Sequence, residues 1–415
     1  MTSAEETAPI AAAIDRIART DGGRLLSNLV GAIRDFQLAE DSLQDALESA
    51  LTHWNRNGLP ASPNAWLMQT AKRKAIDRLR RSANFRSKSA EIMHLIEMEN
   101  ASVMNDDPDP IGDERLKLIF TCCHPALDRK TCVALTLRSV CGLKTEEIAD
   151  AFLDSHEAMA QRLVRARHKI ANAGIAYEVP GPDGWQARLE SVLAVIYLIF
   201  NEGYASSGDS LIRSELCEEA IRLGRLLILL RPHEPEIEGL LALMLLHHAR
   251  RAARLGEQGE IVSLEEQDRE RWDRFEIREG IALLERALRH GRPGPYQLQA
   301  AIIAVHAEAS SFTETNWAEI ALLYRELART SDNPVYELNR IVALSYVGGP
   351  NAALALMQPI AQALVHYQPF YAVQADLLAR TGQTDAARIA YRTAIRLSQS
   401  DAEKLFLAEK INTLG

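Results

Sequence analysis

The segment TEEIADAFLDSHEAMAQRLVRARHKI, residues 145–170, carries the pattern that decides how the middle of the chain folds. It fits a short helix, a turn of three residues and a second helix whose N-cap is Ser155. Four apolar residues follow at helical spacing and predict one buried stripe: Met159, Leu163, Ala166 and Ile170. The opposite stripe is polar and basic: Ala158, Gln161, Arg162, Arg165 and Lys169. The segment predicts a helix-turn-helix that reads a major groove, with a solvated basic face as the alternative.

An acidic helix is predicted earlier in the chain, in LAEDSLQDALESALTHW, residues 38–54. Its apolar face is Leu38, Leu43, Leu47 and Leu51. The opposite face carries Glu40, Asp41, Gln44, Asp45 and Glu48. An acidic helix beside basic ones favours a protein partner on that face, and a plain solvent-exposed face is the alternative.

A basic helix is predicted directly after it, in PNAWLMQTAKRKAIDRLRRS, residues 63–82. The intervening 55–63, NRNGLPASP, reads as a loop, and Pro63 suits the first turn of a helix. Five side chains are expected to face a core: Trp66, Leu67, Thr70, Ile76 and Leu79. The remaining surface is crowded with Lys72, Arg73, Arg80 and Arg81. Such a helix would bind DNA with salt-dependent affinity, and a solvated basic helix is the alternative.

Charge is distributed unevenly along the 415 residues, whose formal net charge is −9. Residues 1–175 are close to neutral and the acidic excess lies after them. Local basic patches, rather than the net charge, decide whether a surface attracts phosphates. The start, MTSAEETAPI, lacks the layout of a signal peptide, and the longest apolar runs are too short to span a bilayer. We therefore expect a cytoplasmic protein.

Five cysteines are present, and three of them, Cys122, Cys123 and Cys132, lie near His124. Adjacent cysteines do not have the C-x-x-C spacing that surrounds a tetrahedral zinc ion. Buried thiols at a helix end are the simpler interpretation. We expect no metal and no cofactor.

A repeat appears in the last part of the chain. Five pairs of similar residues are each separated by 34 positions: Tyr336 and Phe370, Leu344 and Leu378, Ala353 and Ala387, Met357 and Tyr391, Ile360 and Ala394. This is the period of the tetratricopeptide (TPR) helix pair, and small residues at 353 and 387 would let two helices cross closely. A TPR-like helical solenoid is favoured over an irregular helical bundle.

The predicted fold class is all-α, because apolar residues recur at threes and fours and strand alternation is nearly absent. Helices are expected at 10–35, 39–55 and 63–82. The predicted parts are a first helical domain, a tether rich in acids and prolines, a second helical domain ending in the helix-turn-helix, and the solenoid: 10–82, 83–112, 113–176 and 185–415.

Three motifs in this order resemble the extracytoplasmic-function sigma factors of the sigma-70 family: LAEDSLQDAL, then PNAWLMQTAKRKAIDRLRR, then TEEIADAF followed by MAQRLVRAR. This resemblance covers about 10–175. The elements CCHPAL (122–127) and LIFNEGYASS (198–207) resemble the subgroup with a C-terminal TPR-like extension. The resemblance implies region 2, a linker, region 4 and that extension.

The resemblance also implies partners, core RNA polymerase and promoter DNA, and roles for matching residues. Polymerase binding falls to Glu40, Asp41, Gln44, Asp45 and Glu48. Capture of the melted −10 element falls to Asn55, Arg56, Asn57, Lys72, Arg73, Lys74, Asp77, Arg80 and Arg81. Reading of the −35 duplex falls to Ser155, Ala158, Gln161, Arg162, Arg165, Arg167 and Lys169. The turn departs from the family pattern at Leu153, Asp154 and Ala158.

No P-loop, G-x-S-x-G or H-E-x-x-H motif occurs, so we expect no enzyme activity. His247 and His248 are expected to be ordinary packing or surface histidines. The leading hypothesis is a sigma factor whose C-terminal part, which has a peptide or protein as a candidate partner, regulates or supports its activity. The alternative is a helix-turn-helix regulator with a TPR sensor domain that is not a polymerase subunit.

Overall fold

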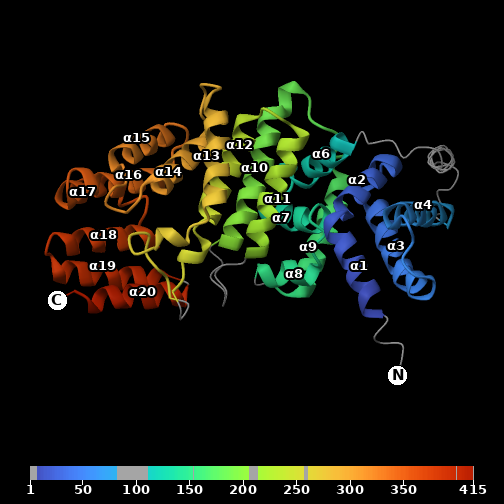
Figure 1. Cartoon of the computed structure of the whole chain (residues 1–415), viewed down its shortest axis with the longest axis horizontal. Helices are drawn as coiled ribbons and strands as arrows, with labels where there is room; N and C mark the ends of the chain where they lie inside the picture. Colours follow the sequence, from blue (N-terminus) through green and yellow to red (C-terminus); the bar gives the residue numbers. More distant parts are fainter. Residues whose placement is uncertain are drawn as a thin grey trace. The chain divides into compact units, whose positions relative to one another are not determined.

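The protein is described by a computed structural model, which covers residues 7–81, 111–152, 154–204, 214–256, 260–398 and 400–414. In these residues every regular element is a helix, and Leu255 and Ile261 form one isolated bridge. The all-α prediction is confirmed. Most of the 83–112 tether, the turn residue Leu153 and most of the 198–207 element's end lie outside the described residues. Two compact units, residues 1–199 and 200–415, are each described separately (Figure 1).

The first unit begins with four helices: α1 (Thr7–Thr20), α2 (Gly22–Ile33), α3 (Phe36–Asn57) and α4 (Pro63–Arg81). The prediction of one helix over 10–35 is wrong, because the chain breaks at Asp21. The break brings Gly23 against a carbonyl. A Cβ at Gly23 would lie 2.5 Å from the backbone oxygen of Val140, so a larger residue cannot occupy this position without displacing backbone.

The buried face of α3 differs from the predicted leucine stripe. Leu51 is exposed, whereas the face that packs inward is Phe36, Ala39, Leu43, Ala46, Ala50 and Trp54. Small alanines on this face let α4 approach closely, which outweighs the larger burial that leucines would give. The rotation of the face has a direct consequence, because Glu40 becomes buried with only 8% of its surface exposed.

Four shorter helices complete this part of the first unit: α6 (Ile111–Cys122), α7 (Arg129–Ser139), α8 (Thr145–Ala151) and α9 (His156–Asn172). Ser155 caps α9 by accepting a hydrogen bond from the Ala158 amide at 3.2 Å, as predicted. The predicted stripe Met159, Leu163, Ala166 and Ile170 is buried along its whole length. Helix α10 (Pro182–Tyr204) follows and crosses the division between the units.

The second unit is a succession of helices in chain order: α11 (Ser214–Leu230), α12 (Pro235–His248), η1 (Arg251–Ala253), η2 (Arg269–Arg271), α13 (Arg274–Leu288), α14 (Pro295–Glu308), α15 (Trp317–Ala328), α16 (Pro334–Val347), α17 (Pro350–Met357), η3 (Gln358–Ile360), α18 (Gln368–Arg380), α19 (Thr384–Leu397) and α20 (Asp401–Asn412). Most consecutive helices from α11 onward pack against each other. No helix in the described residues is long and apolar enough to cross a membrane.

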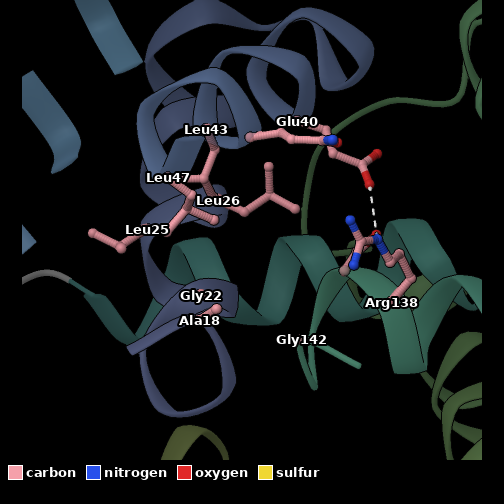
Figure 2. A pocket seen from close by; sticks show the side chains of 11 residues that line it. Ala18, Gly22, Leu25, Leu26, Glu40, Leu43, Leu47, Arg138 and Gly142 are labelled. Carbon is pink, nitrogen blue, oxygen red and sulfur yellow. Dashed lines mark ion pairs between the residues drawn. The ribbon is translucent and has the colours of Figure 1, made fainter. Parts of the chain in front are cut away.

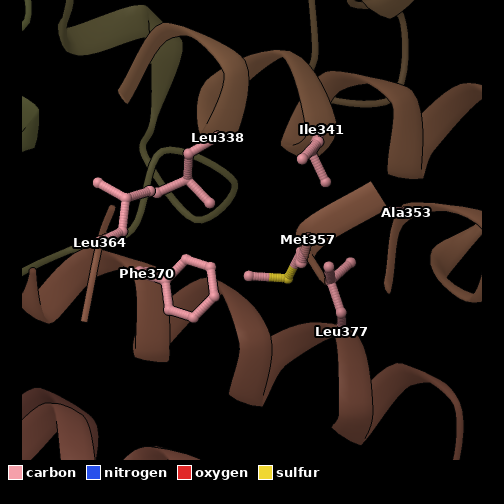
Figure 3. Packing of buried hydrophobic residues seen from close by; sticks show 7 residues of the cluster. All are labelled: Leu338, Ile341, Ala353, Met357, Leu364, Phe370 and Leu377. Atoms are coloured by element: carbon pink, nitrogen blue, oxygen red, sulfur yellow. The ribbon is translucent and has the colours of Figure 1, made fainter. Parts of the chain in front are cut away.

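A 34-residue offset relates two helix pairs of this unit. Helices α16 and α18 begin at 334 and 368, and α17 and α19 begin at 350 and 384. Figure 3 shows the core between them, where Met357 and Phe370 meet beside Ala353. Ala353 and Ala387 are both buried, as expected of the small residue in each repeat.

Candidate functional site

The acidic face of α3 is tied to α4 by one arginine. Arg78 of α4 contacts Asp41 at 3.1 Å and Asp45 at 2.9 Å, and all three side chains are partly exposed. Farther along the face, Gln44 and Glu48 are exposed and lie within 3.4 Å of each other. Four of the five residues predicted to bind polymerase therefore lie at or near the surface of one helix face. Glu40 is the exception.

Helix α4 presents its cations to solvent together with the end of α3. Eight of the nine residues predicted for the −10 element are exposed or half-exposed: Asn55, Arg56, Asn57, Arg73, Lys74, Asp77, Arg80 and Arg81. Lys72 differs, since it is buried with 8% of its surface exposed. Trp54 is also buried, at 1%, and its ring meets Trp66 edge-on at 5.4 Å. Trp54 is thus a core residue, as the sequence favoured.

Helix α9 carries its basic residues in two environments. Gln161, Arg165 and Lys169 are exposed, whereas Arg162 lies 2.5 Å from Asp154 in the turn before the helix. Arg165 has no carboxylate partner among the described residues. A cleft of about 280 Å³ lies against this face and is lined by Leu127, Asp128, Lys130, Thr131, Arg162, Arg165, Ala166 and Lys169. The cations in this lining make it a basic cleft of the kind that attracts phosphate.

Arg167, also on α9, points elsewhere and joins the acidic helix. It donates to Glu40 Oε1 at 2.9 Å, and its Nε lies 2.6 Å from Glu40 Oε2. Arg138 of α7 approaches the same carboxylate at 3.9 Å. Figure 2 shows Glu40 and Arg138 facing each other across a pocket of about 80 Å³ whose other side is apolar, with Leu25, Leu26, Leu43 and Leu47. A residue predicted for polymerase and one predicted for DNA are therefore bound to each other.

Burial opposes the negative charge of Glu40. Loss of solvent raises the pKa of this carboxyl above its usual value, although Arg167 and Arg138 act to lower it. Desolvation of the two charges therefore outweighs their attraction. Glu40 and Arg167 specify how the helices meet more than they add to stability.

Further contacts join α1 and α2 to the α6–α9 part. Lys144 lies 2.8 Å from Asp15, and Arg19 lies 2.5 Å from Glu147. Tyr177 donates through its hydroxyl to the Ser27 carbonyl or the Glu114 carbonyl, both at 3.0 Å. The two predicted sigma regions thus form one packed body in this arrangement.

The cysteine group near His124 consists of buried thiols. Burial raises the pKa of Cys123 to about 12 and that of Cys132 to about 11. The Cys132 thiol points to the carbonyls of His124 and Leu127. In the described residues no group of three or more metal-binding side chains is assembled. Metal binding needs the thiolate, which this environment disfavours.

Comparison with known proteins relates two segments of the chain to described families. Residues 20–85 match Sigma-70 region 2, which covers α2 to α4. Residues 188–288 match a family of unknown function, DUF6596. An uncharacterized protein of Rhizobium meliloti (strain 1021) is 42% identical over 390 residues, 93% of this chain and 92% of that protein. The chain belongs to the same family as this protein and contains a sigma-70 region 2 domain. No solved structure matches it.

The pairing of Glu40 with Arg167 was not found from the sequence. The two residues are 127 positions apart and each fits a solvent-facing stripe of its own helix. A signal did exist in α3, because Ala39, Ala46 and Ala50 mark a face of close approach that lies next to Glu40. Reading the small residues as the packing face would have placed Glu40 at its edge.

Proposed function

We propose that the chain is a sigma factor that binds core RNA polymerase and directs promoter-specific initiation. The match of α2 to α4 with Sigma-70 region 2 is the observation that carries this proposal. The exposed acids of α3 supply a protein-binding face and the exposed cations of α4 supply a nucleic-acid face. A melted strand needs a basic groove beside a folded support, and this helix pair has both.

Region 4, the helix-turn-helix of α8 and α9, is proposed to read the −35 element. The buried stripe of α9 fixes the helix while Gln161 and Arg165 remain exposed on the other side. Arginine and glutamine have the donor geometry for base edges, and Lys169 suits a phosphate. The basic cleft beside α9 supports this assignment.

The described arrangement is proposed to be a closed state of the sigma factor. Glu40 cannot contact polymerase while it is bound to Arg167, and Arg167 cannot contact DNA while it is bound to Glu40. Because desolvation already weakens this pair, opening costs less than breaking a strong ion pair would. Polymerase binding and separation of the two regions are then linked equilibria.

The C-terminal helices are proposed to be a TPR-like solenoid that regulates or supports activity and binds a peptide or protein. Repetition of α16 and α17 as α18 and α19 after 34 residues supports the solenoid. A chain truncated after Ile199, assayed beside the full chain for transcription with core polymerase, tests the role. Equal promoter output from both would contradict it.

The test of the function itself uses the exposed end of the α3 face. Gln44→Lys with Glu48→Lys reverses the charge there without touching the Arg78 or Arg167 contacts. We expect polymerase binding to fall about 100-fold or more, because like charges then oppose across a desolvated interface. Binding is measured by co-purification and by titration of labelled chain with core enzyme.

Glu190→Lys is the matched control, since Glu190 is also exposed and also accepts from a glutamine one turn away, at 3.5 Å. It is expected to leave polymerase binding unchanged. Failure of the unaltered chain to bind polymerase, with DNA binding retained, would favour the alternative of a helix-turn-helix regulator that is not a polymerase subunit.

A further inference from the structure

A cluster of arginines lies inside the second unit, within and next to the segment of unknown function. Arg250 and Arg269 are buried, with 9% and 8% of their surfaces exposed, and Trp272 lies between them at 2%. The guanidinium carbons lie 5.8 Å and 4.8 Å from the centre of the Trp272 ring. Arg254 stacks over Tyr204 at 3.6 Å, and Arg250 donates to the Tyr204 hydroxyl at 2.7 Å. Three cations therefore meet around two aromatic rings.

No carboxylate of the described residues forms an ion pair with any of these three arginines. Their hydrogen-bond acceptors are neutral. Arg254 donates to the carbonyl of Tyr204, and Arg269 donates to the carbonyls of His306 and Ala309. The nearby acids Asp273 and Glu276 already pair with Arg251 and His248.

Helix ends offset only part of this charge. The accepting carbonyls lie at the C-terminal ends of α10 and α14, each of which carries roughly half a negative charge. Three guanidinium groups against two such ends leave about two positive charges uncompensated. Buried charge of this size is costly unless a counter-charge is present.

Unused donors surround the same place. Arg250 Nε, Trp272 Nε1 and His306 Nδ1 are buried and have no hydrogen-bond partner in the described part of the chain. Neighbouring cations and burial also lower the pKa of His306 to about 4 and that of His247 well below its usual range, so both rings are neutral at pH 7. The region is rich in donors and lacks acidic acceptors. That is the composition of an oxyanion site.

We propose that this cluster binds a divalent oxyanion of the phosphate type, either free phosphate or the phosphoryl group of a small molecule. Arg250 and Trp272 would donate to its oxygens, while Arg254 and Arg269 balance its charge. A phosphate monoester carries between one and a half and two negative charges at pH 7, roughly the amount left uncompensated. Tyr204 and Arg254 are partly exposed and give the anion a route from solvent. This site does not depend on the sigma-factor proposal.

The test is titration calorimetry of the full chain in phosphate-free buffer with inorganic phosphate, phosphoserine and acetate at matched ionic strength. We expect phosphate or phosphoserine to bind and acetate to bind at least about tenfold more weakly, because a single charge meets fewer of the donors. Stronger binding of phosphoserine would identify a phosphoryl ligand, and equal binding would identify the free ion. Absence of binding by both would overturn the proposal.

Arg250→Gln is expected to weaken binding at least about tenfold, since it removes a charge and a donor. Arg271→Gln is the matched control, because Arg271 is exposed and lies two residues from Arg269. If Arg250→Gln fails to fold, Trp272→Phe keeps the ring and removes only the indole donor, and weaker binding is again expected. Unchanged binding in either folded variant would place the anion elsewhere and contradict the proposal.

Discussion

Two buried arginine groups in this chain differ in what compensates them. In the first unit Arg167 and Arg138 share the carboxylate of Glu40, whereas in the second unit Arg250, Arg254 and Arg269 have carbonyls and aromatic rings around them and no described acid. The first group is a closed set of charges. The second is an open set whose donors are incompletely used. The difference suggests that the first group joins two parts of the protein and the second receives something from outside.

The comparison is sharpest in stability. Glu40→Leu removes the carboxylate and leaves two guanidinium groups in a buried interface, so we expect a loss of about 3 kcal/mol or more. Arg250→Met removes an uncompensated charge, so in phosphate-free buffer we expect a change of about 1 kcal/mol or less, in either direction. Calorimetric unfolding, with the transitions of the two units fitted separately, measures both.

Glu48→Gln on the exposed face of α3 is the control for Glu40→Leu and is expected to change stability by less than about 0.5 kcal/mol. A large loss from Arg250→Met in the absence of anion would break the comparison, since it would show that the second group is already compensated within the folded protein.

The two units should also differ in acid. Because the folded pKa of His306 is about 4 and its ordinary value is 6.5, the unfolded chain takes up a proton between these values and the folded chain does not. The stability of the second unit is then full above pH 6.5 and is lost as the pH falls toward 4, by an amount on the order of 3 kcal/mol. His247 acts in the same direction. Urea unfolding of His306→Gln between pH 7 and pH 4.5 should show a shallower loss than the unaltered chain, and an identical slope would contradict the burial of a neutral ring.

Paired and unpaired arginines should differ in DNA recognition too. Arg165 is exposed without a carboxylate partner in the described residues, whereas Arg162 must leave Asp154 to reach DNA. We expect Arg165→Ala to weaken recognition of the −35 element by about 1 to 3 kcal/mol and Arg162→Ala to weaken it less. Promoter titrations with the polymerase complex measure this. A uniform loss on every sequence would make Arg165 a phosphate contact.

The smallest expected effect lies in the exposed pairs that join the two regions. Arg19→Glu replaces an attraction to Glu147 with a repulsion outside both predicted functional faces. We expect polymerase affinity to rise by no more than about fivefold, because exposed ion pairs contribute up to about 1 kcal/mol. The swap Arg19→Glu with Glu147→Arg should restore the original affinity. Equal affinity in all three forms would argue against a closed state.

Most helices could be predicted from the sequence, because helical periodicity is a local property. The α9 stripe from Met159 to Ile170 and the Ser155 cap needed only 16 consecutive residues, 155 to 170, and both are confirmed. The break at Asp21 was missed, since no proline marks it and Gly23 is required by a contact with Val140 far along the chain.

The buried charges could not be predicted because their surroundings are assembled from distant segments. Lys72 and Glu40 lie within stripes that look solvent-facing, and Arg250 and Arg269 belong to different elements. His247 was expected to be an ordinary packing or surface residue, yet it borders the arginine group through Tyr204. The roles of the polymerase and promoter residues remain predictions, because they depend on molecules outside this chain.

One measurement tests the proposed function most directly. The purified chain is mixed with core RNA polymerase on genomic DNA, and the 5′ ends of the transcripts are mapped. We expect a small set of start sites preceded by two shared sequence elements, all lost with Gln44→Lys and Glu48→Lys and all kept with Glu190→Lys. Transcripts that start at random, or no more often than with core polymerase alone, would contradict the assignment of this chain as a sigma factor.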